Sequence, residues 1–179
     1  SLAALGQRFN SLLVASATVA HVALIWGLLE VFPSFHKWGI AFGITLAFVM
    51  GGISLAFSFI RKRYGWKTLG MLPGLASPMP RLGVAMVFLV SFALFLPLFP
   101  IFSGLIDMPT IVNSNIEIGM ISFLFLVVWL GGGGYFIQML HQTAFGEARS
   151  DVPYFDLRLT ELVAVSALLL GATYSGIIY

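Results

Sequence analysis

The feature that most constrains this chain is a set of long apolar stretches that contain no Asp, Glu, Lys or Arg. They cover approximately residues 12–29, 38–60, 82–106, 118–140 and 162–179. A bilayer hydrocarbon core of about 30 Å needs roughly 20 helical residues to cross it. The stretches are continuous, whereas the strands of a membrane barrel alternate apolar and polar residues. Because the bilayer core offers no water to unpaired backbone groups, we expect helices. The sequence therefore predicts an all-α polytopic membrane protein with five transmembrane helices.

The composition agrees with this class. Apolar residues make up 59% of the chain and charged residues only 9%, whereas a soluble domain carries about 25% charged residues. The absence of cysteine excludes disulfides and Cys-based metal sites. A net charge of +2 is too small to indicate a nucleic-acid partner. No linker or repeat divides the sequence, so we expect a single membrane domain over residues 1–179.

The basic residues are distributed unevenly between the two sides of the predicted membrane domain. If the helices alternate in direction, one side receives only Lys37 of the nine Lys and Arg residues. The other side, called the basic side below, receives Arg8, Arg61, Lys62, Arg63, Lys67, Arg81, Arg149 and Arg158. By the positive-inside rule this is the cytoplasmic or mitochondrial matrix side. The C-terminus is then expected on the opposite side.

The third stretch contains its own interruption. Residues 94–110 read LFLPLFPIFSGLIDMPT, with Pro97, Pro100, Pro109 and a lone acid, Asp107. Proline removes a backbone donor, so we expect the third helix to be broken here, where protein or water satisfies the freed carbonyls. Breaks of this kind form ion pathways, which makes Asp107 a candidate proton carrier. The alternative is a surface carboxylate that caps the turn before Pro109.

Few other polar residues fall within the helices. His21 lies in the middle of the first stretch, where an imidazole is either a proton relay or a neutral group bonded to a neighbouring helix. Tyr135, Gln138 and His141 follow an i, i+3, i+6 spacing, so they line a polar path toward the basic side or serve in packing. Glu30 is expected to be solvated at a helix end, as is Glu117.

Local signals refine this picture. Asp156 is a candidate N-cap for the last helix, with Glu161 in the first turns, where acids suit the helix dipole. The glycines at 51–52 and 131–134 predict close helix packing. The second run, in WLGGGGYF, requires either support from neighbours or local unwinding. No HExxH motif, phosphate-binding loop, Ser-His-Asp arrangement or metal-ligand spacing occurs, so we expect no bound NADH, flavin, iron–sulfur cluster, quinone or metal.

Four segments of the chain form a series. They are ALGQRFNSLLVASATVAHVAL at 4–24, RKRYGWKTLGMLPGLASPMP at 61–80, the LP, F and SG of 94–110, and FG at 145–146 followed by DLRLTEL at 156–162. In this order they resemble the C-terminal half of subunit 4 of NADH:ubiquinone oxidoreductase, respiratory complex I. The bacterial counterpart is the antiporter-like M subunit. In the first segment Ser16, Thr18 and His21 stand near the family's Ser-Ser-x-x-His pattern.

The resemblance implies the C-terminal part of a fourteen-helix antiporter-like fold. The preceding helices would come from a separate chain, and the partners would be other membrane-arm subunits and the lipid bilayer. The chain would be a non-redox subunit of a proton-translocating enzyme, with no catalytic activity of its own. Its location would be the mitochondrial inner membrane or, alternatively, the bacterial plasma membrane. The candidate proton-pathway residues are His21, Asp107, Ser16, Thr18, Tyr135 and His141.

The sequence also departs from this family. Leu46 and Leu105 stand where the family usually has a His and a Glu. One alternative is therefore a structural scaffold of the same complex with a degenerate proton path. Others are a subunit of a related cation/proton antiporter or of a membrane-bound hydrogenase. An independent small transporter would require a self-contained polar cavity, which these helices do not indicate.

Overall fold

The computed structural model describes residues 9–31, 36–65, 68, 71, 73–94 and 115–178. Within these ranges the regular secondary structure is helical, apart from an isolated β-bridge between Phe9 and Thr68. The helices are α2 (Asn10–Val31), α3 (His36–Tyr64), α4 (Pro80–Ala93), α6 (Asn115–Thr143) and α7 (Leu159–Ile178). By length and composition α2, α3 and α7 are able to cross a membrane. This agrees with the prediction of an all-helical, multi-pass membrane protein.

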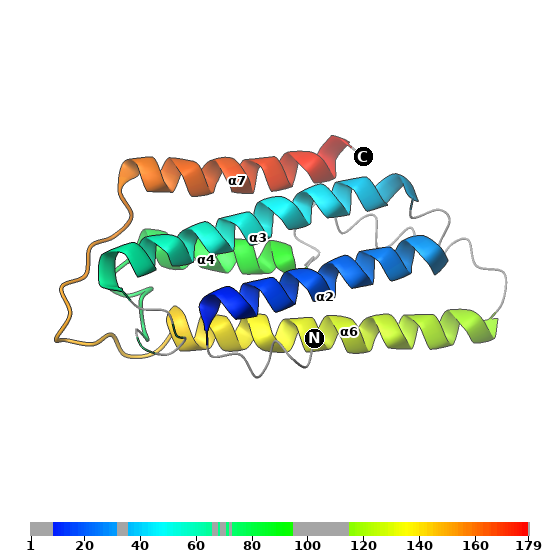
Figure 1. Ribbon diagram of the computed structural model, residues 1–179, viewed down its shortest axis with the longest axis horizontal. Helices are drawn as coiled ribbons and strands as arrows, with labels where there is room; N and C mark the ends of the chain where they lie inside the picture. The colour runs from blue at the N-terminus through cyan, green and yellow to red at the C-terminus, as the bar shows by residue number, and fades with distance from the viewer. Residues whose placement is uncertain are drawn as a thin grey trace.

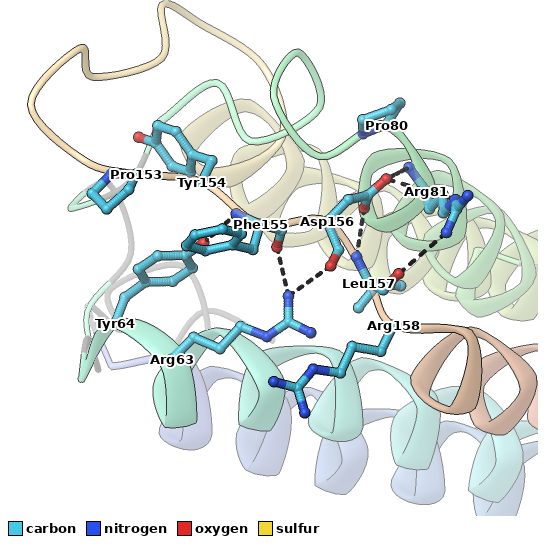
Figure 2. Close-up of a pocket in the computed structure, with 10 residues that line it drawn as sticks. All are labelled: Arg63, Tyr64, Pro80, Arg81, Pro153, Tyr154, Phe155, Asp156, Leu157 and Arg158. Atoms are coloured by element: carbon cyan, nitrogen blue, oxygen red, sulfur yellow. Dashed lines mark hydrogen bonds and ion pairs between the residues drawn. The ribbon is translucent and has the colours of Figure 1, made fainter.

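The helices lie roughly side by side along the long axis of the molecule (Figure 1). α3 occupies the centre, in contact with α2, α4 and α7. α4 also contacts α6 and α7, and α2 contacts α6. α3 carries the basic residues Arg61, Lys62 and Arg63 in its last turn, at the end of the bundle where α4 and α7 begin. Arg158, in the segment before α7, lines a pocket at this same end (Figure 2).

The third helix differs from its predicted extent. It begins at Pro80 and ends at Ala93, with Leu94 as its C-cap, whereas the sequence predicts a helix over 82–106. Its 14 residues rise about 21 Å at 1.5 Å per residue, which is less than the thickness of a bilayer core. The proline-containing segment, Asp107 and Leu105 all lie outside the described residues. The predicted proline break therefore stays a prediction.

Glycines allow the central helices to approach closely at Gly52, which was predicted, and at Gly171, which was not. A Cβ on Gly52 of α3 would lie 2.5 Å from Leu89 Cδ2 of α4, and one on Gly171 of α7 would lie 3.0 Å from the Phe48 ring of α3. α6 remains helical through the glycines at 131–134, so the run is not unwound. Leu94, at the end of α4, packs near this glycine run, since a Cβ on Gly133 would lie 3.9 Å from Leu94 Cδ2.

Asp156 caps a different helix from the one predicted. α7 begins at Leu159, two residues too late for Asp156 to be its N-cap. Instead Asp156 accepts hydrogen bonds from the backbone N–H groups of Arg81 (3.2 Å) and Leu82 (3.4 Å) in the first turn of α4. The N-cap of α4, Met79, has no side-chain cap of its own, so the carboxylate from a distant loop satisfies these donors.

Glu161 lies in the first turn of α7, as predicted. Its carboxylate accepts the backbone N–H of Arg158 at 2.8 Å and pairs with Arg63 from the end of α3. Arg63 also donates to the backbone carbonyls of Phe155 (2.5 Å) and Asp156 (2.9 Å), as Figure 2 shows. Through these contacts Arg63 holds the segment before α7, at Phe155 and Asp156, against the end of α3.

Candidate functional site

His21 is the polar member of an otherwise apolar helix face. The face of α2 that meets the bundle carries Val14, Ala17, Ile25 and Leu28 at helical spacing, all buried. His21 occupies the central position of this series and is only 7% exposed. The helix therefore carries one titratable group into the middle of the apolar bundle, where an unpartnered polar group is costly.

Tyr135 of α6 provides a hydrogen-bonding partner for His21. Its hydroxyl oxygen lies 2.9 Å from His21 Nδ1, and its side chain is fully buried. The same Nδ1 also lies 2.9 Å from the carbonyl oxygen of Ala17, one turn earlier in α2. The carbonyl only accepts a hydrogen bond, whereas the tyrosine hydroxyl both donates and accepts. A protonated Nδ1 therefore donates to Ala17, and an unprotonated Nδ1 accepts from Tyr135.

The end of α4 meets this pair. A helix leaves its last carbonyls without partners inside the helix. The backbone of Ala93 forms a hydrogen bond with the His21 side chain, and the indole N–H of Trp129 donates to the carbonyl of Leu94 at 2.7 Å. Donors from α2 and α6 thus complete the C-terminal end of α4. The site is a junction of three helices, placed where the short helix stops.

The surroundings of the pair are aromatic. The Phe136 ring lies 5.7 Å from the His21 ring and 4.6 Å from the Tyr135 ring, measured between centroids. The His21 and Tyr135 rings meet edge-on at 80°, with centroids 6.2 Å apart. A Cβ on Gly132 would lie 3.9 Å from His21 Cε1, so the α6 backbone passes close to the imidazole.

The hydroxyls of Ser16 and Thr18 have other partners than the His21–Tyr135 pair. Ser16 donates to the carbonyl of Leu13 at 3.0 Å, and Thr18 donates to that of Val14 at 2.7 Å, so each hydroxyl bonds back to its own helix. Thr18 instead lines a pocket of about 540 Å³ between α2 and α3, together with Arg61. This pocket opens near the basic side of the bundle.

His141 also lies away from the junction. His141 is exposed in the last turn of α6, about 9 Å along the helix from Tyr135 at 1.5 Å per residue. Gln138, between them, is half-buried. Asp107 lies outside the described residues. Glu30 is exposed at the end of α2, as predicted, whereas the side chain of Glu117 is not among those described.

Sequence reasoning missed two groups of residues. Trp129, with the carbonyl it binds, was not predicted, although a tryptophan within a membrane helix needs a partner for its N–H. The second group is a buried pair between α3 and α7, in which Thr45 Oγ1 lies 2.6 Å from Ser175 Oγ. Ser175 donates to the carbonyl of Ala172, so Thr45 is the donor within the pair. Isolated hydroxyls in apolar runs gave no signal that these two would meet.

The described residues contain no cluster of three or more His, Cys, Asp or Glu side chains able to hold a metal ion. What the junction offers chemically is a proton donor and acceptor pair held in an apolar setting. No protein-family model matches the sequence, and no curated protein matches it at a significant level.

Proposed function

We propose that this chain is a membrane-arm subunit of a proton-translocating NADH:ubiquinone oxidoreductase. In this proposal it contributes the C-terminal half of an antiporter-like proton channel, and a separate chain supplies the preceding helices. The observation that carries the proposal is the buried hydrogen bond between His21 and Tyr135. Titratable side chains within membrane helices are expensive and mark proton or ion pathways.

The pair supports a defined proton step. With Nδ1 unprotonated, the hydroxyl of Tyr135 donates to it across 2.9 Å. The O–H bond breaks as the Nδ1–H bond forms, the preceding proton donor of the pathway returns a proton to the phenol oxygen, and Nε2 releases its proton onward, so that both side chains end neutral. Concerted transfer is required because a phenolate alone in an apolar site costs several kcal/mol. The new N–H then donates to the carbonyl of Ala17, which already lies 2.9 Å away.

The sequence resemblance connects this step to a complex. The segment that contains Ser16, Thr18 and His21 is one of four that resemble subunit 4 of complex I, in the same order. Proton movement would then be coupled to redox chemistry in other subunits. The location would be the mitochondrial inner membrane or a bacterial plasma membrane.

One observation favours a second candidate, a structural scaffold of the same complex with a degenerate proton path. Leu46, at the position where the related family usually has a His, is 3% exposed and belongs to the apolar core of the bundle. The neighbouring Thr45 bonds to Ser175 of α7, which serves helix packing. In this alternative the His21–Tyr135 bond has the same packing role.

Proton stoichiometry in the assembled complex tests the proposal. His21→Phe and Tyr135→Phe remove the titrating groups but keep ring volume, so the number of protons moved per electron should fall in both. Ser16→Ala is the control, because its hydroxyl bonds only to the carbonyl of Leu13 among the described residues. A stoichiometry unchanged in both variants would favour the scaffold. Isolation of the chain without any subunit of an NADH dehydrogenase would overturn both candidates.

A further inference from the structure

Two pockets at the basic side of the bundle share Pro80 and Arg81. The larger, of about 920 Å³, lies between the end of α3, the start of α4 and the segment before α7, as Figure 2 shows. The smaller, of about 440 Å³, lies between α4 and α7 and is called the α4–α7 groove below. Arg81 therefore connects an arginine-lined pocket at the surface with an apolar groove in the membrane region.

The α4–α7 groove runs into the bilayer from the basic side. Its walls are Val84, Ala85 and Phe88 of α4 and Leu162, Val165, Ser166 and Leu169 of α7. Both helices begin at the same end of the bundle (Figure 1), so both walls run inward together. From Arg81 to Phe88 the wall extends about 10 Å at 1.5 Å per residue, roughly a third of the hydrocarbon core. Val84 and Phe88 are 57% and 49% exposed, so the groove is open along α4.

The mouth of the groove is positively charged. Three arginines line the larger pocket, Arg63, Arg81 and Arg158, against one carboxylate, that of Asp156. Arg63 forms an ion pair with Glu161, which does not line this pocket. Arg81 has a side chain 57% exposed, with its Nε 3.9 Å from the Asp156 carboxylate.

The carboxylate at the mouth is already engaged by the protein. Asp156 accepts the backbone N–H groups of Arg81, Leu82 and Leu157, so its charge is shared among several donors. No carboxylate of the described residues lies within 4.0 Å of the Arg158 guanidinium. The mouth therefore carries excess positive charge, with Arg81 and Arg158 able to accept an anionic partner.

From this combination we propose that the chain binds one acidic glycerophospholipid. The headgroup phosphate contacts the guanidinium of Arg81, which lines both pockets, and one acyl chain lies in the α4–α7 groove. A basic pocket beside membrane helices on the positively charged side attracts anionic headgroups. The apolar groove directly beside the charge selects a lipid over a soluble anion. This inference does not depend on proton transport.

Spin-labelled lipids in vesicles test the inference with the full chain. The chain is reconstituted in phosphatidylcholine vesicles that contain a trace of labelled phosphatidylglycerol or labelled phosphatidylcholine. The immobilised fraction of each label gives the preference for the acidic lipid. One guanidinium near the membrane surface contributes about 1 kcal/mol, so Arg81→Gln should lower the preference about fivefold. Arg81→Lys keeps the charge and should retain most of the preference for the acidic lipid. This variant separates lost binding from misfolding.

Two further variants decide between this site and general attraction. Lys62→Gln makes the same charge change at the same end of the bundle, on an exposed residue that lines neither pocket, and should lower the preference less than Arg81→Gln does. Ser166→Phe fills the groove and should reduce the immobilised fraction of both labels. Equal losses in Arg81→Gln and Lys62→Gln would overturn the proposal. So would an unchanged immobilised fraction in Ser166→Phe, or exclusion of both labels by a protein helix seated in the groove.

Discussion

The indole of Trp129, in the middle of α6, donates its N–H to the carbonyl of Leu94 at the C-cap of α4, 2.7 Å away. This bond joins two helices through a backbone group that the end of α4 leaves unpaired. An unsatisfied carbonyl in a membrane interior costs several kcal/mol, because no water replaces the lost donor. The position at which α4 ends is therefore stabilised from a neighbouring helix.

Replacement of this indole should destabilise the bundle. Trp129→Phe keeps an aromatic ring but removes the donor, so we expect the free energy of unfolding to fall by about 1–3 kcal/mol. Unfolding by sodium dodecyl sulfate in mixed micelles, followed by circular dichroism, measures the change. Trp26→Phe is the matched control, because Trp26 is 68% exposed. Equal effects of the two substitutions would show that the bond to Leu94 contributes nothing.

The cap on α4 gives a second prediction. Asp156→Ala removes the acceptor of the Arg81 and Leu82 N–H groups and should destabilise the protein by about 0.5–2 kcal/mol, the usual effect of losing an N-cap. Asp156→Asn retains an acceptor oxygen and should cost less. Asp151→Ala removes an exposed carboxylate that pairs with Arg149 and serves as the control in the same unfolding assay. If Asp151→Ala costs as much as Asp156→Ala, the capping role is wrong.

Some of this structure was predictable from the sequence, and some was not. The positions of α2, α3 and α7 follow from long uncharged runs, because a bilayer dictates the length of a spanning helix. A proline break was predicted within residues 94–110, but residues 82–106 contain no charge that marks Ala93 as the last residue of α4. The cap at Asp156 was assigned to the nearest helix in sequence, whereas its partner lies 75 residues away.

The candidate site was also predictable only in part. His21 was predicted because an ionisable group in an apolar helix stands out, and Tyr135 because it belongs to a polar series on its helix. Their pairing depends on how α2 and α6 are rotated about their axes, and apolar residues on all sides of a membrane helix leave that rotation undetermined. Thr18 was grouped with His21 because both stand near the Ser-Ser-x-x-His pattern of the resembled family. Thr18 and His21 are three residues apart, so their side chains point in directions about 60° apart around the helix axis. They therefore reach different partners.

Adjacent glycines on α3 give a third prediction with a built-in control. A Cβ on Gly51 would meet nothing within 4 Å, whereas a Cβ on Gly52 would meet Leu89 of α4 at 2.5 Å. Gly51→Ala should therefore stabilise the helix, by up to about 1 kcal/mol from helix propensity alone. Gly52→Ala gains the same propensity but forces Leu89 to shift, so it should be the less stable of the two variants. The same detergent assay compares them, and a more stable Gly52→Ala would contradict the close packing of α3 and α4.

The buried hydroxyl pair of Thr45 and Ser175, between α3 and α7, gives a fourth prediction. Thr45→Val and Ser175→Ala each remove one side of the 2.6 Å hydrogen bond. A double-mutant cycle should return a coupling energy of about 0.6 kcal/mol, the average for hydrogen bonds between membrane helices. The single variants include other losses, such as the bond from Ser175 to the carbonyl of Ala172, and only the cycle isolates the pair. Additive effects of the two substitutions would mean that the hydroxyls are not coupled.

Membrane orientation gives the last prediction, and the composition makes it easy to test. The chain contains no cysteine, so a single introduced cysteine is its only thiol. Lys62 and Glu30 are exposed near opposite ends of the bundle, in the last turns of the antiparallel helices α3 and α2. Because basic residues stay on the cytoplasmic or matrix side, a membrane-impermeant maleimide should label Lys62→Cys only from that side. It should label Glu30→Cys only from the other. Labelling of both variants from one side would mean that α2 and α3 do not cross the membrane in opposite directions, and the reverse pattern would mean that the basic residues do not set the orientation.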